Sequence, residues 1–223
     1  MTLLDELLTE LEAHRDEKYA AFNASLINCS AESLIGVRVP ELRKIAKKYV
    51  PRIDELFAVR DDRYEVKFVK LAAAARLEYA EFLKYLEPCV ALIDNWALCD
   101  CFSAKCIARH REEFRPYMDK FLSDGREFYQ RYALTTLLSF YVEEQYLGYI
   151  FDCLMRADCT KYYVHMAAAW LVCEVIVKHY ERGTEFLRQG TLDRATHNKA
   201  IQKSAESFRL NTDQKNYLKS LKR

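Results

Sequence analysis

The chain has 223 residues, of which 51% are hydrophobic and 30% are charged, and 34 basic residues face 33 acidic ones for a formal net charge of +1. This composition excludes an intrinsically disordered chain, and the near-neutral total is not the strong basic excess typical of nucleic-acid-binding proteins. Only five glycines and four prolines occur. Tight turns are therefore scarce, which argues against an all-β fold.

Eight cysteines lie mostly inside apolar runs rather than at regular loop spacings, at Cys29, Cys89, Cys99, Cys101, Cys106, Cys153, Cys159 and Cys173. This pattern predicts reduced thiols in the protein core and a reducing, cytoplasmic location. Asp5 and Glu6 stand where a secretory signal would need positive charge. The most apolar segment, 162–177, is shorter than the roughly 20 residues of a membrane span, so no membrane partner is expected.

In the first fifty residues, apolar side chains recur at three- and four-residue steps, which predicts helices over 3–14 and 16–27. The stretch from Gly36 to Pro40 then breaks the pattern. Gly36 permits an unusual backbone conformation, and Pro40 is suited to open a helix that continues to Tyr49.

The rest of the chain reads as one helix after another, without strand alternation or a flexible linker. The expected ranges are 53–59, 63–79, 79–93, 95–110, 113–123, 126–142, 144–156, 161–181, 183–189, 194–207 and 211–222. Helix pairs recur about every 35 to 40 residues, as in HEAT-type repeats. We therefore expect an all-α single domain over 1–223, a curved solenoid of stacked antiparallel helix pairs with a concave binding face. A compact all-α globule is the alternative.

Trp96 and Asp100 are four residues apart, so they share one helix face and place an aromatic wall beside a carboxylate. Such a pair can hold a cationic or electron-poor group and stabilise positive charge that develops during a reaction. A core tryptophan beside a surface aspartate explains the same spacing.

Two further side chains stand out in apolar helices. Arg131 lies in a helix that is apolar nearly all round, where its guanidinium needs an anion, either an internal carboxylate or a bound phosphate. Trp170 follows three alanines, whose small side chains leave its large ring prominent on the helix. Glu174 lies one helical turn later. Packing between repeats also accounts for this tryptophan.

The segment 194–223 holds eight basic and two acidic residues, a local net charge of 8 − 2 = +6 within a neutral chain. A patch of this kind favours a phosphate backbone, although a solvated helix face has the same appearance. Cys99, Cys101 and Cys106 do not match a common zinc-site spacing, and no glycine-rich phosphate loop occurs. No metal and no cofactor are expected.

Four motifs occur together in a recognisable order: Gly36-Val-Arg-Val-Pro-Glu-Leu-Arg-Lys44, Trp96-x-x-x-Asp100, Gln130-Arg131 and Ala169-Trp170. In order and approximate spacing, they resemble the AlkD-like family of alkylpurine DNA glycosylases. The resemblance extends over nearly the whole chain, from Tyr19 to Arg209. It implies a fold of HEAT-like helical repeats.

The resemblance also implies a reaction, hydrolysis of the N-glycosidic bond of a cationic N3- or N7-alkylated purine in duplex DNA held in a concave groove. Asp100 would be the catalytic carboxylate, with Trp96 and Trp170 against the deoxyribose and backbone of the lesion. The implied DNA-binding residues are Arg131, Arg38, Tyr19, Lys199, Lys203 and Arg209. A rival hypothesis is a non-catalytic helical-repeat module that binds DNA or a protein partner. A monomer is expected in either case.

Overall fold

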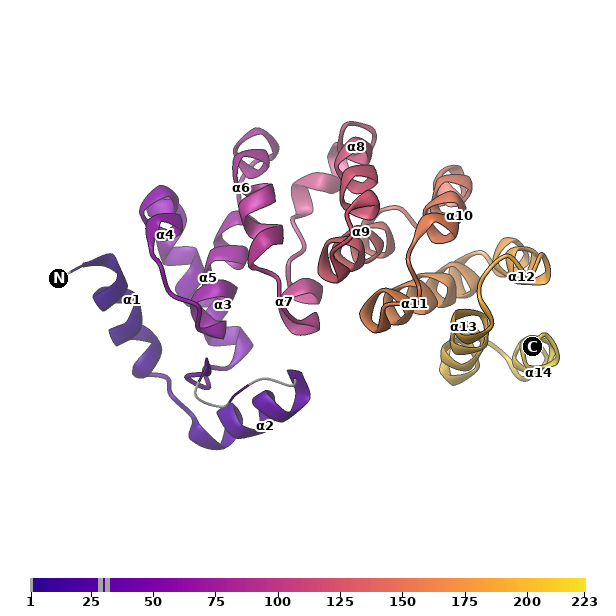
Figure 1. Cartoon of the computed structure of the whole chain (residues 1–223), viewed down its shortest axis with the longest axis horizontal. Coiled ribbons are helices and arrows are strands. Elements are labelled where there is room, and N and C mark those ends of the chain that lie inside the picture. The colour runs from indigo at the N-terminus through magenta and orange to yellow at the C-terminus, as the bar shows by residue number, and fades with distance from the viewer. Residues whose placement is uncertain (1, 28–29, 31–32) are drawn as a thin grey trace. The chain divides into compact units, whose positions relative to one another are not determined.

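A computed structural model describes residues 2–27, 30 and 33–223, and helices and short 3-10 turns are the regular elements of these residues (Figure 1). No strand occurs in the described ranges, so the all-α prediction is confirmed for them. The chain divides into two compact units, unit 1 over Met1–His110 and unit 2 over Arg111–Arg223. The expected single domain and the curved solenoid stay predictions, and each unit is described by itself.

Unit 1 is built around one buried helix, α5 (Tyr64–Ala74), which packs on four other helices of the unit. Tyr64, Val66, Phe68, Val69 and Leu71 of α5 are all buried. The remaining helices are α1 (Leu3–Glu12), α2 (Glu17–Ile27), α3 (Val39–Tyr49), α4 (Ile53–Ala58), α6 (Tyr79–Leu92) and α7 (Trp96–Cys101), with 3-10 turns at Val50–Arg52 and Lys105–Arg109.

Unit 2 repeats this arrangement around α11 (Tyr162–Lys178), which packs against α9, α12 and α13. Its other helices are α8 (Arg111–Ser123), α9 (Glu127–Phe140), α10 (Leu147–Arg156), α12 (Tyr180–Arg188), α13 (Arg194–Glu206) and α14 (Thr212–Ser220), with a 3-10 turn at Glu144–Tyr146. In unit 1, α3, α5 and α7 pack in succession, and in unit 2 α9, α11 and α13 do the same. Packing of alternate helices is what stacked helix pairs produce.

Several predicted helix boundaries are wrong. The helix expected over 63–79 ends at Ala74. The helix expected over 95–110 ends at Cys101, because Phe102 leaves the helical conformation and its ring is buried 6.0 Å from the Phe82 ring. The helix expected over 161–181 ends at Lys178. The next helix begins at Tyr180 and contains Gly183, which the sequence had suggested as a helix start. An added Cβ at Gly183 would lie 2.6 Å from an Ile176 side-chain atom, so glycine allows the close approach of α11 and α12.

Seven cysteines fall within the described residues and all are free thiols. Five are buried, whereas Cys101 and Cys159 are half-buried, and Cys29 lies outside the described residues. Burial raises the pKa of Cys89 and Cys153. Cys89 and Cys153 are therefore protonated, poorly reactive thiols, and the prediction of core cysteines is confirmed for the five buried ones.

Candidate functional site

Trp96 and Asp100 occupy the first and fifth positions of the short helix α7 in unit 1. Asn95 caps this helix, because its side-chain oxygen accepts a hydrogen bond from the Leu98 backbone N–H at 3.0 Å. Trp96 and Asp100 are both half-buried, whereas Ala97, Leu98 and Cys99 between them are buried. The helix thus buries one face in the unit and keeps the tryptophan and the carboxylate accessible.

The Trp96 ring is fixed at its polar edge. Its indole Nε1–H donates to the backbone carbonyl of Leu26 at 3.2 Å, at the C-terminal end of α2. This bond uses the only donor that an indole ring has and ties α7 to α2. The orientation of Trp96 therefore depends on α2 as well as on its own helix.

Cys101, the residue after Asp100 in α7, is half-buried and interacts electrostatically with Arg43 of α3. Burial raises the pKa of Cys101, Asp100 raises it further, and the Arg43 guanidinium of α3 opposes that shift. Arg43 is exposed and belongs to the Gly36-to-Lys44 motif. The positive charge of Arg43 therefore acts on α7. The Gly36-to-Lys44 motif alone did not reveal this interaction.

Tyr19 and Arg38, two predicted DNA-binding residues, lie together in unit 1. The Arg38 guanidinium carbon lies 4.8 Å from the centre of the Tyr19 ring, and Arg38 donates to the Asp16 carboxylate at 2.8 Å. Burial raises the pKa of Tyr19, an effect that the nearby Arg38 charge opposes. The Arg38 side chain is 64% exposed in this ion pair, so the cation remains accessible to a ligand.

The loop that carries Arg38 is held by a buried carboxylate that the sequence analysis did not single out. Glu65 of α5 is fully buried and accepts hydrogen bonds from the backbone N–H groups of Ile35, Gly36 and Val37 at 2.8 to 3.3 Å. Gly36 has a φ of +93°, and a Cβ there would lie 2.2 Å from the Asp16 carbonyl oxygen. Only glycine fits this position, which explains the motif and confirms the backbone freedom expected of Gly36.

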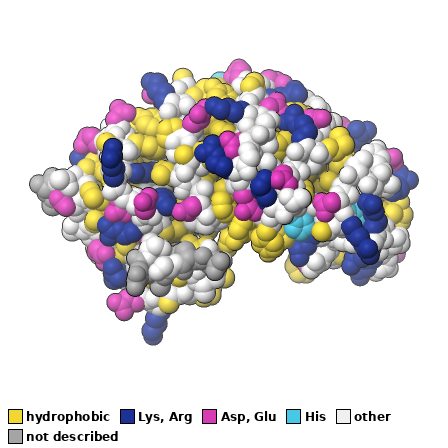
Figure 2. Space-filling model, in the orientation of Figure 1, with side chains coloured by type: hydrophobic (Ala, Val, Ile, Leu, Met, Phe, Trp, Pro, Cys, Tyr) yellow, Lys and Arg dark blue, Asp and Glu magenta, His cyan; other side chains and the backbone are white. Residues whose placement is uncertain are grey.

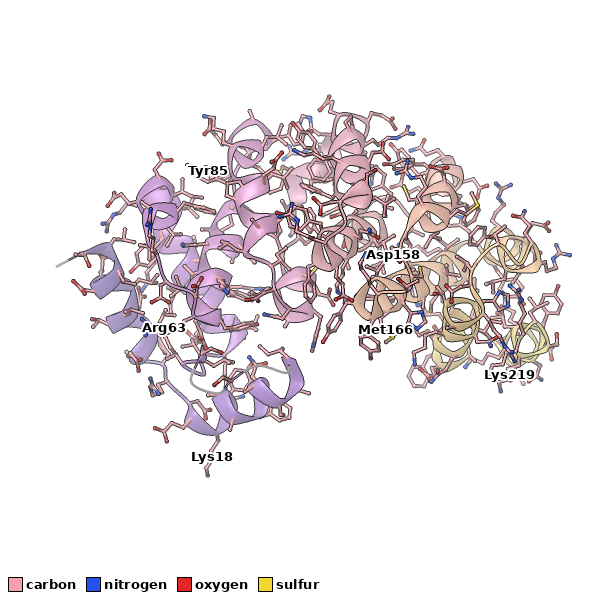
Figure 3. All side chains as sticks on the ribbon, viewed as in Figure 1. Lys18, Arg63, Tyr85, Asp158, Met166 and Lys219 are labelled. Carbon is pink, nitrogen blue, oxygen red and sulfur yellow. The ribbon has the colours of Figure 1, made fainter. Side chains whose placement is uncertain are left out.

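In unit 2, Trp170 is part of an exposed apolar stripe along α11. Tyr162, Met166 and Trp170 follow one another at four-residue spacing, so they lie on one helix face, and Figure 3 labels Met166 on that helix. Tyr162 is 63% exposed and Trp170 is 38% exposed. Trp170 is therefore not a fully buried core residue, although most of its surface is covered.

Basic side chains of α13 and the following segment lie beside this stripe, because α11 and α13 pack against each other. Lys199 and Lys203 stand one turn apart on α13, and Figure 2 shows Lys and Arg side chains gathered over α13 and α14. Arg209 donates to the Glu174 carboxylate at 3.1 and 2.6 Å, one turn beyond Trp170 on α11. Lys203 has no ion-pair partner among the residues that the structure describes. The α11 stripe and these cations form a mixed aromatic and basic surface of unit 2.

Arg131 lies in α9 and is only 5% exposed. Its guanidinium donates to the backbone carbonyl of Tyr163 at 2.9 Å, while Glu127, one turn earlier, accepts from the Tyr163 N–H at 2.6 Å. Arg131 and Glu127 together bind both backbone groups of Tyr163 in the first turn of α11. A role of Arg131 toward phosphate stays a prediction, since the contact present here is to protein backbone.

The structure thus groups the predicted residues by unit. Unit 1 holds Trp96, Asp100, Tyr19 and Arg38, and unit 2 holds Trp170 and Arg131 together with Lys199, Lys203 and Arg209. Glu65, Arg43 and Tyr162 were missed in the sequence, because a buried glutamate, a helix arginine and an exposed tyrosine have no distinctive spacing. Within the described part of the chain, no three His, Cys, Asp or Glu side chains gather to hold a metal ion, and no helix has the length and apolar character of a membrane span.

These observations define an all-helical protein with a half-buried carboxylate and tryptophan on one short helix and an aromatic, basic surface on another unit. The sequence matches the family of DNA alkylation repair enzymes over residues 7–207, and the chain belongs to that family. The family resemblance of the four motifs is therefore confirmed. No curated protein matches the chain.

Proposed function

We propose that the protein is a DNA glycosylase that hydrolyses the N-glycosidic bond of N3- or N7-alkylated purines. The observation that carries the proposal is the joint presence of Trp96 and Asp100, both half-buried, on one helix of a DNA alkylation repair family member. A fully buried pair would have no access to a substrate.

The proposed role of Asp100 is to stabilise positive charge in the transition state. An alkylated purine already carries positive charge, so it leaves as a neutral base when the bond from C1′ to the ring nitrogen breaks and the electron pair goes to the purine. Positive charge then builds up on the sugar, and a carboxylate facing it stabilises the transition state. Water adds to C1′, and its proton passes to the carboxylate or to solvent. No strong general acid is needed for this leaving group.

The aromatic and basic side chains would bind the DNA. Trp96 lies beside Asp100, and its fixed Nε1–H leaves the ring face for contact with the deoxyribose. In unit 2, the exposed ring of Trp170 and the cations at Lys199, Lys203 and Arg209 provide an apolar and a positive surface for the strand. Cationic contacts to phosphates make such binding weaken with added salt.

The experiment is release of free methylated purine from methylated duplex DNA by the purified protein. Asp100→Asn is expected to slow release by about a hundredfold or more while the melting temperature and the DNA affinity stay unchanged. Asp62→Asn serves as the matched control, because the Asp62 side chain is fully exposed in the same unit, and it should retain full activity.

Equal release by the wild type and Asp100→Asn would reject the role of Asp100. No release by the wild type, together with salt-sensitive DNA binding, would reject the glycosylase and leave a DNA-binding module. Absence of both release and DNA binding would favour a helical-repeat protein that binds another protein.

A further inference from the structure

A pocket lies between the exposed stripe of α11 and the neighbouring face of α13, and we call it the α11–α13 pocket. It has a volume of about 320 Å³, within the range of sites for small ligands. Its lining residues come from α11, from α13 and from the segment after α14: Tyr162, His165, Met166, Ala195, Asn198, Lys199, Gln202 and Lys222.

One wall of the pocket is apolar and aromatic. Tyr162 is 63% exposed, and its ring meets the Tyr163 ring edge-on with centres 5.1 Å apart, which supports it from one side. Met166 lies one turn further along the same face of α11. An exposed ring beside a polarizable thioether is a surface on which a flat heteroaromatic ring stacks well.

The opposite wall is positive. Lys199 and Lys222 line it, and none of the described lining residues is Asp or Glu. The Lys199 ammonium donates to the neutral Gln202 side chain at 3.2 Å. Two ammonium groups without a lining carboxylate attract an anion, and phosphate is the common biological one.

Hydrogen bonds hold two parts of the pocket lining in place: the segment after α14 and the His165 side chain of α11. Asn198 accepts from the Arg223 N–H at 3.0 Å and donates to the Arg223 main-chain oxygen at 2.7 Å, which ties the segment carrying Lys222 to α13. His165 Nδ1 is hydrogen-bonded to the Thr196 hydroxyl at 2.8 Å, so Nε2 is the ring nitrogen available to a ligand.

We propose that the α11–α13 pocket binds a nucleoside 5′-monophosphate unit, with the base against Tyr162 and Met166 and the phosphate against Lys199 and Lys222. This inference deepens the proposed function and rests on it in one respect, because Lys199 is also one of the DNA-binding cations proposed above. Its readout does not require excision. The same chemical unit has two sources, a free nucleotide or a nucleotide within a DNA strand, and the test separates them.

The experiment measures binding to the full chain by titration calorimetry, with four probes: dAMP, deoxyadenosine, inorganic phosphate and a short single-stranded oligonucleotide. We expect dAMP to bind more tightly than either deoxyadenosine or phosphate alone. Tyr162→Ala should weaken dAMP binding roughly tenfold, as loss of one base-stacking ring does. Lys199→Gln should weaken dAMP binding roughly threefold and leave deoxyadenosine binding unchanged.

Lys219→Gln is the matched control, since this lysine lies on α14 and does not line the pocket (Figure 3). It should bind dAMP as the wild type does. Tyr162 and Lys199 are largely or partly exposed, so both variants should fold, and circular dichroism verifies this.

The pattern of binding separates the two sources. Binding of dAMP that needs Tyr162 and Lys199 supports the nucleotide site. Binding of the oligonucleotide without any binding of dAMP would overturn it and leave only the DNA-binding surface of the proposed function. The proposal is overturned if phosphate binds as tightly as dAMP, if neither dAMP nor the oligonucleotide binds, or if Lys219→Gln weakens binding as much as Lys199→Gln. Excision of alkylated purines plays no part in this readout, so failure of the proposed function is seen separately.

Discussion

The two units place their aromatic candidate residues in different settings. In unit 1, the candidates are tied into the fold, because Trp96 donates to Leu26, Arg38 pairs with Asp16, and Glu65 holds the loop of Gly36. In unit 2, Tyr162 on α11 is largely exposed and Trp170 on the same helix is partly exposed. The difference indicates that unit 1 fixes the orientation of a candidate reactive group, whereas unit 2 offers an exposed aromatic and basic surface.

The largest stability effect should come from Gly36→Ala in unit 1. The new methyl group would stand 2.2 Å from the Asp16 carbonyl oxygen, at a backbone φ of +93° that an L side chain rarely adopts. We expect a loss of about 3 kcal/mol in the free energy of unfolding, measured by urea denaturation. Gly148→Ala in unit 2 is the control, because an added Cβ there meets nothing within 4 Å. Equal stability of the two variants would show that the loop relaxes and that unit 1 is less rigid than inferred.

The next largest effect should come from Arg131→Gln in unit 2. Arg131 is 5% exposed and donates to the Tyr163 carbonyl, so its removal leaves that contact unmade in a buried place. The free energy of unfolding should fall by about 2 kcal/mol. DNA binding by the folded variant is then compared with that of Lys203→Gln, a variant of a surface cation. A variant of Arg131 that keeps full stability and loses DNA affinity would identify Arg131 as a phosphate ligand instead.

A smaller effect separates the two tryptophans. Trp96→Phe keeps an aromatic ring but loses the hydrogen bond from Nε1 to the Leu26 carbonyl, which should cost about 1 kcal/mol of unfolding free energy. Trp170→Phe is the matched variant in unit 2. Its ring is 38% exposed, so the free energy of unfolding should change by no more than about 0.5 kcal/mol. The comparison between the units fails if Trp170→Phe is the more destabilising of the two.

The smallest effect concerns pH and the ion pair between Glu174 and Arg209. The hydrogen bond from Arg209 holds the pKa of Glu174 below its ordinary value of 4.5. The pair therefore stabilises the fold fully above that ordinary value, and the contribution is lost as the pH falls through the lower pKa of the folded state.

We expect the wild type to exceed Glu174→Gln in unfolding free energy by less than about 1 kcal/mol near pH 7, because Arg209 is largely exposed. The gap should close once the pH has fallen below the lowered pKa of Glu174 in the folded state, where the carboxyl is protonated in both the folded and the unfolded chain. A gap that widens on acidification would mean that another group, not this pair, controls the acid sensitivity of unit 2.

Within the described ranges, the sequence predicted the all-α fold and the position of most helices, because apolar side chains at three- and four-residue steps record which face of a helix is buried. It also predicted that Trp96 and Asp100 share a helix, since that depends on local spacing alone. The break after Cys101 was missed because burial of Phe102 against Phe82, two distant residues in the chain, overrides the local helical pattern. Neither glycine nor proline marks that break.

The candidate site was less predictable than the fold. The motif around Gly36 pointed to a special backbone, but the partner that requires it, Glu65, lies about 30 positions later in a helix that reads as ordinary core. The exposure of a side chain also cannot be predicted from a single sequence. An aromatic residue in an apolar helix has the same sequence pattern whether it is buried, as Tyr132 is, or exposed, as Tyr162 is. Only the packing of neighbouring helices separates the two cases.

What the sequence by itself determined is therefore local: helix periodicity, the glycine at position 36, and the order of motifs that marks a DNA alkylation repair family member. The tertiary structure decided which charges are held by the protein and which face solvent. The Arg131 guanidinium donates a hydrogen bond to the backbone of α11, whereas Lys199 and Lys222 line a pocket. The reason is that burial and ion pairing arise between residues far apart in the chain, so no window of sequence contains both partners.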